Sequence, residues 1–349
     1  MRTISIEQKQ ALEDLSAQGL LKNLPVQTAE KDIHITELLR ALGDLRVEHD
    51  FFSDMKRGEK ARHDTGIQLV FAGGTCLSKA HGLINRMSED VDIKVLLTPP
   101  EKPFTKGRGD HARLKRLHAE LPKLLEALDF PLLQYGDGIR NPHIRDAHRY
   151  YVVGAGYASS YDQIPSLRPE LKLELIERKP LLPLERLQFG YLYEKLARLP
   201  FSAPATIDCI SIAETAAEKV LSLLRRCAWK WDGHQRGEMD AALVRHVYDV
   251  GLIAQRSPNS LKAARSIFPQ LVANDRDEFR GQHPEFDTAP ANVLRRALHT
   301  AKANGELAAR YEERLRPLVY DELAPSFETS FELFEAVAED FLSACEDVR

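Results

Sequence analysis

The sequence has few of the features that mark secreted, zinc-clamped or membrane-spanning chains. Its 349 residues include only four cysteines, which are far apart and show no paired ligand spacing, so neither a zinc site nor a disulfide framework is predicted. No uninterrupted apolar run approaches the roughly 18 to 20 residues that a membrane helix needs, and residues 1–10 contain no apolar signal region. We therefore expect a cytoplasmic protein without membrane contact.

Two common catalytic signatures are also missing. No Gly-x-x-x-x-Gly-Lys-(Ser/Thr) sequence is present, which argues against a P-loop kinase or ATPase. No Gly-x-Ser-x-Gly elbow is present, which argues against a Ser-His-Asp hydrolase. The hydrophobic fraction of 43% is sufficient for folded cores, and the length leaves room for two domains. The chemistry of this globular chain must therefore come from other motifs.

Charge is nearly balanced but unevenly distributed. The formal net charge of −4 argues against a strongly cationic coat for nucleic acid. Residues 102–149 are nevertheless rich in Lys, Arg and His, whereas residues 321–347 are acidic. We interpret the basic segment as a candidate RNA surface and expect the acidic segment to repel phosphate. A solvated amphipathic helix over residues 110–128, with leucines at helical spacing, is the alternative interpretation.

The most informative stretch begins with an apolar run of strand length, residues 67–71, that stops at Gly73 and Gly74. Thr75 then opens a segment with helical spacing. Glycines let the backbone approach an anion, and a helix N-terminus offers unpaired N–H groups, with the Thr75 hydroxyl as a cap or phosphate donor. The pattern predicts a strand, a tight turn and a helix that cradle a triphosphate, with Lys79 as a further phosphate ligand.

A pair of aspartates follows this turn. Residues 90–96 alternate with period two, so Asp90 and Asp92 share one face of a predicted strand while Val91 and Ile93 face the core. Adjacent carboxylates repel each other, and a shared proton or a divalent cation with hard oxygen ligands relieves the repulsion. Mg²⁺ is the natural candidate and Mn²⁺ its substitute. A solvated strand face without a metal is the alternative.

These residues resemble the AbiEii/AbiGii-type nucleotidyltransferase toxins, within the DNA polymerase β-like nucleotidyltransferase superfamily. The family's Gly-Gly-(Ser/Thr) turn and Arg-x-Ser-x-Asp-(Ile/Val)-Asp motif match Gly73, Gly74, Thr75, Arg86, Ser88, Asp90 and Asp92. Further matches lie at Glu30-Lys31-Asp32, at Ala217-Glu218-Lys219 and in residues 244–249. One departure is His246, which stands where the family usually has an aspartate, so this chain must rely on Asp249 or has altered activity. The resemblance covers about residues 30–255.

The resemblance implies an α+β fold, in which a polymerase β-like mixed sheet flanked by helices is followed by a mostly helical C-terminal domain. The Pro-rich residues 199–204 predict a boundary, which gives a nucleotidyltransferase domain with N-terminal helices over residues 1–204 and a helical domain over residues 205–349. Further strands are predicted over residues 149–155 and 171–176. Helices are predicted over residues 209–229, 239–254, 290–303, 306–315 and 330–344.

Alternation in the strand over residues 171–176 places three leucines on one face and leaves Lys172 and Glu174 on the other. The resemblance implies that Glu174 is the third carboxylate beside Asp90 and Asp92. Glu170 and Glu177 are weaker alternatives for the third carboxylate, and pairing of Glu174 with Lys172 on a solvated face is the alternative without a metal.

The resemblance also implies an activity, the transfer of a nucleoside monophosphate from an NTP to RNA with release of pyrophosphate. The 3′ end of tRNA is the leading acceptor, and the setting is a toxin–antitoxin or abortive-infection system of phage defence, with an antitoxin as partner. Asp90, Asp92 and Glu174 would hold the metal ions, Lys219 would add charge to the triphosphate, and Asp249 would orient Lys219 or the incoming base. Arg86 and Ser88 would shape the turn or touch phosphate.

Two other functions stay open at this point. In the first, the nucleotide is transferred to a hydroxyl of a protein or of a small molecule. The basic segment argues mildly against this function. The second is a catalytically silent nucleotide-binding module with a regulatory role, which the substitution at His246 favours and the intact Asp90 and Asp92 oppose.

Overall fold

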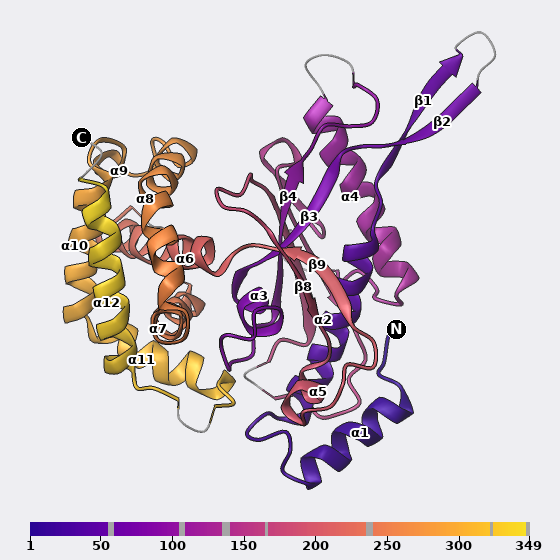
Figure 1. The fold of residues 1–349 in the computed structure, drawn as a ribbon, viewed down its shortest axis with the longest axis horizontal. Coiled ribbons are helices and arrows are strands. Elements are labelled where there is room, and N and C mark those ends of the chain that lie inside the picture. Colours follow the sequence, from indigo (N-terminus) through magenta and orange to yellow (C-terminus); the bar gives the residue numbers. More distant parts are fainter. Residues whose placement is uncertain are drawn as a thin grey trace. The chain divides into compact units, whose positions relative to one another are not determined.

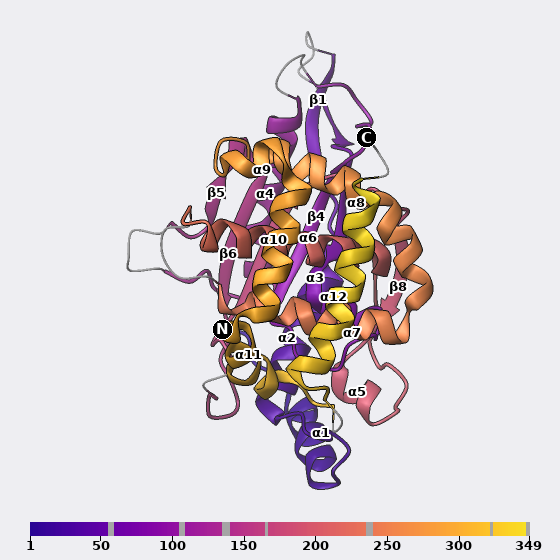
Figure 2. The ribbon, with the colours of Figure 1, turned by 90° about the vertical axis from the view of Figure 1, so that its left-hand side faces the viewer.

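A seven-stranded mixed sheet organises the N-terminal unit of the chain. The structure is a computed structural model that describes residues 1–54, 59–104, 109–134, 140–164, 167–234, 240–321 and 324–346. The order of the strands across the sheet is β5-β6-β7-β4-β3-β9-β8, and Figure 2 shows β5 and β8 at its opposite edges. The strands are β3 (Ile67–Ala72), β4 (Asp90–Leu97), β5 (His143–Arg145), β6 (Tyr150–Gly156), β7 (Glu170–Glu177), β8 (Glu185–Phe189) and β9 (Ala205–Cys209).

The middle of the sheet is built by four of these strands. β4 pairs antiparallel with β3 and parallel with β7, and β3 pairs parallel with β9. The strands predicted over residues 67–71, 90–96, 149–155 and 171–176 are confirmed as β3, β4, β6 and β7. Apolar residues alternate along a strand that is buried on one face and form a continuous run along a strand that is buried on both faces. Each of these strands has one of the two patterns, so the local sequence was sufficient to predict them.

Helices and one hairpin complete this unit. α2 packs against β9, and α4 lies along the same side of the sheet (Figure 1). Ser5 caps α1, because its hydroxyl accepts from the backbone N–H of Gln8, whose side chain accepts from the N–H of Ser5 in return. The elements are α1 (Ile6–Ala17), α2 (Val26–Asp44), α3 (Gly73–Lys79), α4 (Gly109–Ala127), α5 (Leu192–Leu196), the 3₁₀ turn η1 (Asp146–His148) and the hairpin β1 (Glu48–Asp54) and β2 (Glu59–Asp64).

The second unit is helical. It comprises His81–Arg86, Leu181–Pro183 and Ser211–Arg349. Ser211 caps α6 by accepting from the N–H of Glu214, and Ser326 caps α12 in the same way. The helices are α6 (Ile212–Trp231), α7 (Arg245–Arg256), α8 (Pro258–Glu278), α9 (Pro284–Thr288), α10 (Pro290–Ala303), α11 (Gly305–Arg310) and α12 (Phe327–Ala344), with η2 (Ala241–Val244), η3 (Tyr311–Leu315) and η4 (Arg316–Leu318).

Most of the predicted helices are present in this unit. α6, α10 and α12 confirm the predictions over residues 209–229, 290–303 and 330–344. The segment 306–315, predicted as one helix, is α11 followed by the π-helical η3. In the segment 239–254 the helix α7 begins only at Arg245, and Met239 lies outside the described residues. The predicted fold class, an α+β mixed sheet flanked by helices and followed by a mostly helical region, is confirmed.

Candidate active site

Gly73 forms the turn between β3 and α3. Its φ of +74° is a left-handed backbone conformation that favours glycine. A Cβ on this residue would lie 2.0 Å from Oδ2 of Asp92, so no other residue fits without moving the carboxylate. Thr75 fastens the turn to β4, because its hydroxyl donates a hydrogen bond to the backbone carbonyl of Asp90. The glycine turn thus lies directly against the aspartate pair.

The sheet places the three predicted carboxylates together. Asp92 and Glu174 are register partners on the parallel strands β4 and β7, and Asp90 is the register partner of Lys172. Register partners on neighbouring strands point to the same face of a sheet, and so do residues two apart on one strand. Ala72, which precedes the glycine turn, is the partner of Asp92 on β3. One face therefore carries Asp90, Asp92 and Glu174 in adjacent positions.

Two cations share this face with the carboxylates. Nη1 of Arg168 lies 2.8 Å from Oδ1 of Asp90, and Nζ of Lys172 lies 2.9 Å from Oε2 of Glu174. All four side chains are partly exposed, between 24% and 38%. Burial lowers the pKa of Lys172, but Glu174 and Asp90 outweigh it and raise this pKa to about 12, so the ammonium stays charged.

Residues in the N-terminal turns of α2 contact the segments that precede β4 and β7. Lys31 is buried, and its ammonium lies 2.8 Å from Glu89 and 2.9 Å from the backbone carbonyl of Arg168. Glu89 precedes β4 and also accepts the backbone N–H of Arg168 at 2.7 Å. Glu30 accepts from the backbone N–H of Ser160 at 2.7 Å. The triplet that resembles a family motif therefore holds the segments that lead into β4 and β7.

Lys79 is also tied to α2. Its ammonium lies 2.7 Å from Oδ1 of Asp32 and 3.0 Å from the carbonyl oxygen of Gly190, and the side chain is 5% exposed. Burial lowers the pKa of Lys79, and Asp32 opposes this shift. A phosphate contact by Lys79 would first require this ion pair to open.

The helical unit holds a second cluster of predicted site residues. Arg86 donates from Nε and Nη2 to the two carboxylate oxygens of Asp249, each at 2.7 Å, and Nζ of Lys219 lies 2.9 Å from Asp249. Burial raises the pKa of Asp249, but the two cations outweigh it and hold this pKa well below its ordinary value. Asp249 therefore contacts Lys219, and Arg86 has a structural ion pair.

His246 and Ser88 complete the predicted set. His246 is the second residue of α7 and is partly buried, and burial together with the charge of Lys219 lowers its pKa well below the ordinary value. A neutral imidazole therefore stands where the family usually has a carboxylate. Ser88 is partly buried in the segment that precedes β4.

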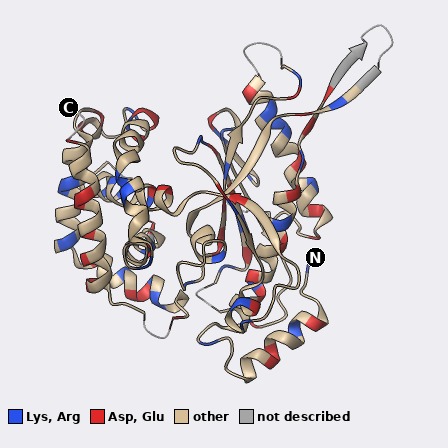
Figure 3. Ribbon diagram, in the orientation of Figure 1, with Lys and Arg blue, Asp and Glu red and all other residues tan. Residues whose placement is uncertain are grey.

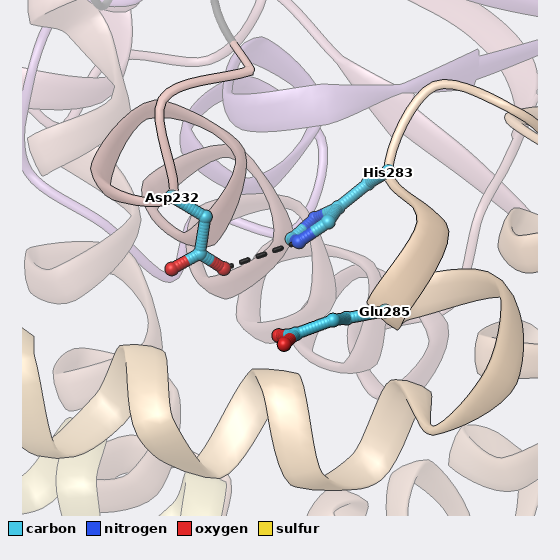
Figure 4. Close-up of side chains that lie close together, drawn as sticks. All are labelled: Asp232, His283 and Glu285. Carbon is cyan, nitrogen blue, oxygen red and sulfur yellow. Dashed lines mark ion pairs between the residues drawn. The ribbon is translucent and has the colours of Figure 1, made fainter.

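Another group of potential metal ligands lies in the helical unit (Figure 4). Nε2 of His283 is 3.1 Å from Oδ2 of Asp232, and Glu285 points toward the same space. Arg296 already neutralises both carboxylates, because its Nη2 lies 2.6 Å from Asp232 and 2.6 Å from Glu285. We therefore assign no metal to this group.

The basic segment is an amphipathic helix with exposed cations on either side of it. Leu114, Leu117, Leu121 and Leu125 of α4 are buried, and charges of both signs are interspersed along its other face (Figure 3). Arg113 is buried and donates to the carbonyl of Thr65 at 2.7 Å. Residues 105–108 and 135–139 of this segment, and residues 322–323 and 347 of the acidic segment, lie outside the described residues. Among the described residues of the segment, the exposed cations are Lys102, Lys115, Lys123, Arg140, Arg145 and Arg149.

Arg168 and Glu89 contact the predicted site residues although no role was predicted for either of them. Arg168 lies in the loop before β7, where no periodic pattern marks it, and its contact with Asp90 exists only because β7 pairs with β4. Glu89 directly precedes Asp90, and this adjacency in the sequence could have indicated that Glu89 lies near the site. Lys172 was recognised as a partner of Glu174, and the structure shows this ion pair.

The glycine turn packs against a strand carboxylate of a mixed sheet, which agrees with the motifs that resemble those of nucleotidyltransferases. The family model of the nucleotidyl transferase AbiEii toxin, of type IV toxin–antitoxin systems, matches residues 59–333, and the chain belongs to this family. The resemblance inferred from the motifs is thereby confirmed. The family makes the chain a nucleotidyltransferase toxin that uses an NTP and has an antitoxin partner.

Solved structures give further matches. MenT4, a nucleotidyltransferase toxin from Mycobacterium tuberculosis H37Rv, is 18% identical with a TM-score of 0.45, over 98% of this chain and 99% of MenT4. An H. pylori protein described as a candidate nucleotidyltransferase is 15% identical with a TM-score of 0.37, over 99% of each chain. None of the curated proteins matches the chain at a significant level. In the described part of the chain, no helix has the length and apolarity to cross a membrane.

Proposed function

We propose that this toxin transfers a nucleoside monophosphate from an NTP to an RNA acceptor, with the 3′ end of tRNA as the leading candidate. The observation that carries the proposal is the register of β4 and β7, which sets Asp92 beside Glu174, with Asp90 on the same face. Three carboxylates on adjacent strands form a set of hard oxygen donors, which suits Mg²⁺ or Mn²⁺. Gly73, which has no Cβ, lets the turn after β3 lie close to the carboxylate of Asp92 without blocking it.

When bound, the metal would neutralise charge at the α-phosphate and activate the acceptor hydroxyl. The chain's own residues position the reactants. The backbone N–H groups of Gly73, Gly74 and Thr75 would hold the β- and γ-phosphates, because the Thr75 hydroxyl already donates to the carbonyl of Asp90. The oxygen of the acceptor hydroxyl bonds to the α-phosphorus, the bond from this phosphorus to the bridging oxygen breaks, and pyrophosphate leaves. The hydroxyl proton passes to water.

Exposed cations at one edge of the sheet support RNA as the acceptor. Arg145 of β5 is exposed, and its guanidinium lies 4.2 Å from the ring centre of Tyr150 on β6. β6 is the neighbour of β7, and burial, followed by the charge of Glu174, raises the pKa of Tyr150. Arginine and aromatic faces together bind single-stranded nucleic acid through charge and stacking. Arg145 and Tyr150 would then guide an RNA end toward the carboxylates.

We also propose, from the match of residues 217–219 to the family motif, that Lys219, whose Nζ lies 2.9 Å from Asp249, contributes to binding of the NTP. Lys219→Ala is expected to raise the KM for the NTP. Lys230→Ala, which removes another lysine of α6 from its ion pair with Glu306, is the matched control and should leave the KM unchanged. An unchanged KM in Lys219→Ala would refute this role.

The test of the proposed function is incubation of purified protein with Mg²⁺, total tRNA and each of the four α-³²P-labelled nucleoside triphosphates in turn. The expected result is label on RNA with the wild type and none with Asp90→Ala/Asp92→Ala. Label on protein or on a small molecule instead of RNA would show that the acceptor is not RNA. No label on any acceptor would favour a silent module.

The biological setting we propose is defence against phage by arrest of the host. Induced expression of the wild type should stop growth, and induction of Asp90→Ala/Asp92→Ala should not. Co-expression of the cognate antitoxin should restore growth. Growth arrest by the double variant would show that toxicity does not depend on nucleotidyl transfer.

A further inference from the structure

The carboxylate face carries its own cations at defined positions. The β4–β7 register sets Asp90 beside Lys172 and Asp92 beside Glu174, so four charged side chains occupy the corners of a square of neighbouring positions on one face. Within this square Nζ of Lys172 lies 2.9 Å from Glu174. Lys172 therefore already neutralises a carboxylate that a divalent cation on this face would use as a ligand.

Arg168 holds the other end of the square. Its Nη1 lies 2.8 Å from Oδ1 of Asp90, and its Nη2 lies 3.5 Å from Oδ2. Its backbone is fixed, because its N–H donates to Glu89 and its carbonyl accepts from the buried Lys31. The side chain of Arg168 is 38% exposed. Arg168 thus has an anchored backbone and a side chain with room to change partner.

The charges of this face explain why both cations are needed. Asp90, Asp92 and Glu174 bring three negative charges within adjacent register positions, and such carboxylates repel each other. Arg168 and Lys172 offset two of these charges. A divalent cation that takes the same oxygens must displace both of them. The displaced cations then need new anions, and the phosphates of the nucleotide supply them.

We propose that Arg168 and Lys172 are exchangeable counter-ions of the carboxylates at the nucleotidyl-transfer site. They hold Asp90 and Glu174 before loading and compete there with a free divalent cation. They turn to the phosphates when cation and nucleotide bind together. This inference rests on the proposed metal site. Its consequence is that cation and nucleotide bind cooperatively, and that the cation alone binds weakly.

The experiment measures two affinities in Lys172→Gln and Arg168→Gln. The first is the affinity for Mn²⁺ alone, obtained from the loss of the free-ion signal in electron paramagnetic resonance. The second is the affinity for the α,β-methylene analogues of ATP, CTP, GTP and UTP in excess Mg²⁺, obtained by calorimetry. In each variant we expect Mn²⁺ to bind about tenfold more tightly, and the preferred analogue about tenfold more weakly, than in the wild type. Misfolding would weaken the binding of both ligands. Tighter Mn²⁺ binding together with weaker analogue binding therefore identifies the counter-ion role.

Arg149→Gln is the matched control. Arg149 pairs at 2.7 Å with Glu177 of β7, which lies outside the carboxylate set, so its removal should change neither affinity. Mn²⁺ binding that is unchanged or weaker in both Lys172→Gln and Arg168→Gln would overturn the counter-ion role. Failure of the underlying metal site has a different signature. In that case wild type and Asp92→Asn bind Mn²⁺ equally, with and without analogue, and the counter-ion role falls with the site.

Discussion

Arg86 and Asp249 form a two-point ion pair although 163 positions separate them in the sequence. The side chains are 2% and 0% exposed, and Lys219 is the second cation on the same carboxylate. Both residues belong to motifs that resemble those of the family, yet their contact is internal to the helical unit. A buried pair of this kind is costly to break, because the remaining charge loses its partner in a buried site.

Asp249→Asn is therefore expected to lower the free energy of unfolding by about 3 to 5 kcal/mol. The substitution leaves Arg86 and Lys219 with a neutral amide in place of the carboxylate. Urea unfolding followed by circular dichroism measures the change. Lys302→Gln, which removes an exposed cation from Glu335 in the same unit, is the control and should leave the transition in place. A loss no larger than that of the control would contradict the structural role of the pair.

Gly73→Ala is expected to abolish nucleotidyl transfer. The new Cβ would lie 2.0 Å from Oδ2 of Asp92 and must displace this carboxylate. Gly19→Ala is the matched control, because Gly19 has a similar φ of +70° and nothing within 4 Å of its Cβ position. Both substitutions should cost about 1 kcal/mol of stability through backbone strain, and only Gly73→Ala should lose activity. Equal activities would show that the turn does not position Asp92.

Asp92→Asn should reduce the rate of transfer more than about 100-fold, since loss of a direct metal ligand exceeds the usual effect of its outer partners. The fold should persist, because Asp92 lies on the open face of β4, whose core-facing neighbours Val91 and Ile93 are unchanged. The rate of label transfer and the unfolding midpoint are the two measurements. Glu177→Gln on β7 serves as the control carboxylate outside the set and should keep the wild-type rate.

The free energy of unfolding should decrease as the pH is lowered from 6.5 to 4. His118 is buried, its Nδ1 lies 2.9 Å from Nδ1 of His148, and its ring packs against Tyr151. Burial, followed by the charge of His148, lowers the pKa of His118 to about 4. The unfolded state binds the proton more tightly, so stability is complete above pH 6.5 and decreases as the pH approaches 4, by up to about 3 kcal/mol.

The change at His118 can be separated from other titrations by substitution. His118→Gln should flatten the dependence of the unfolding free energy on pH in this range. His299→Gln, at an exposed histidine of α10, should keep the wild-type dependence. Parallel curves for wild type and His118→Gln would rule out a contribution of His118.

Local pattern predicted the elements in which one residue type repeats with a clear period. α10 has the bounds that its amphipathic pattern indicated, and β4 and β7 follow from strict alternation. α8 was not predicted, and an interior proline, Pro269, interrupts its pattern. The short strands β8 and β9 were also missed, because five residues each carry too little periodicity. These elements are held by their neighbours and not by their own sequence.

The sequence by itself determined which side chains share a face, because alternation along a strand is a property of the backbone. It therefore set Asp90 with Asp92, and Lys172 with Glu174. Only the tertiary structure decided that β7 lies parallel to β4 in the register that joins these pairs. It also decided that Arg168 meets Asp90 and that Asp249 pairs with Arg86. Such contacts join residues far apart in the chain, and the path of the chain in three dimensions, which no local period encodes, brings them together.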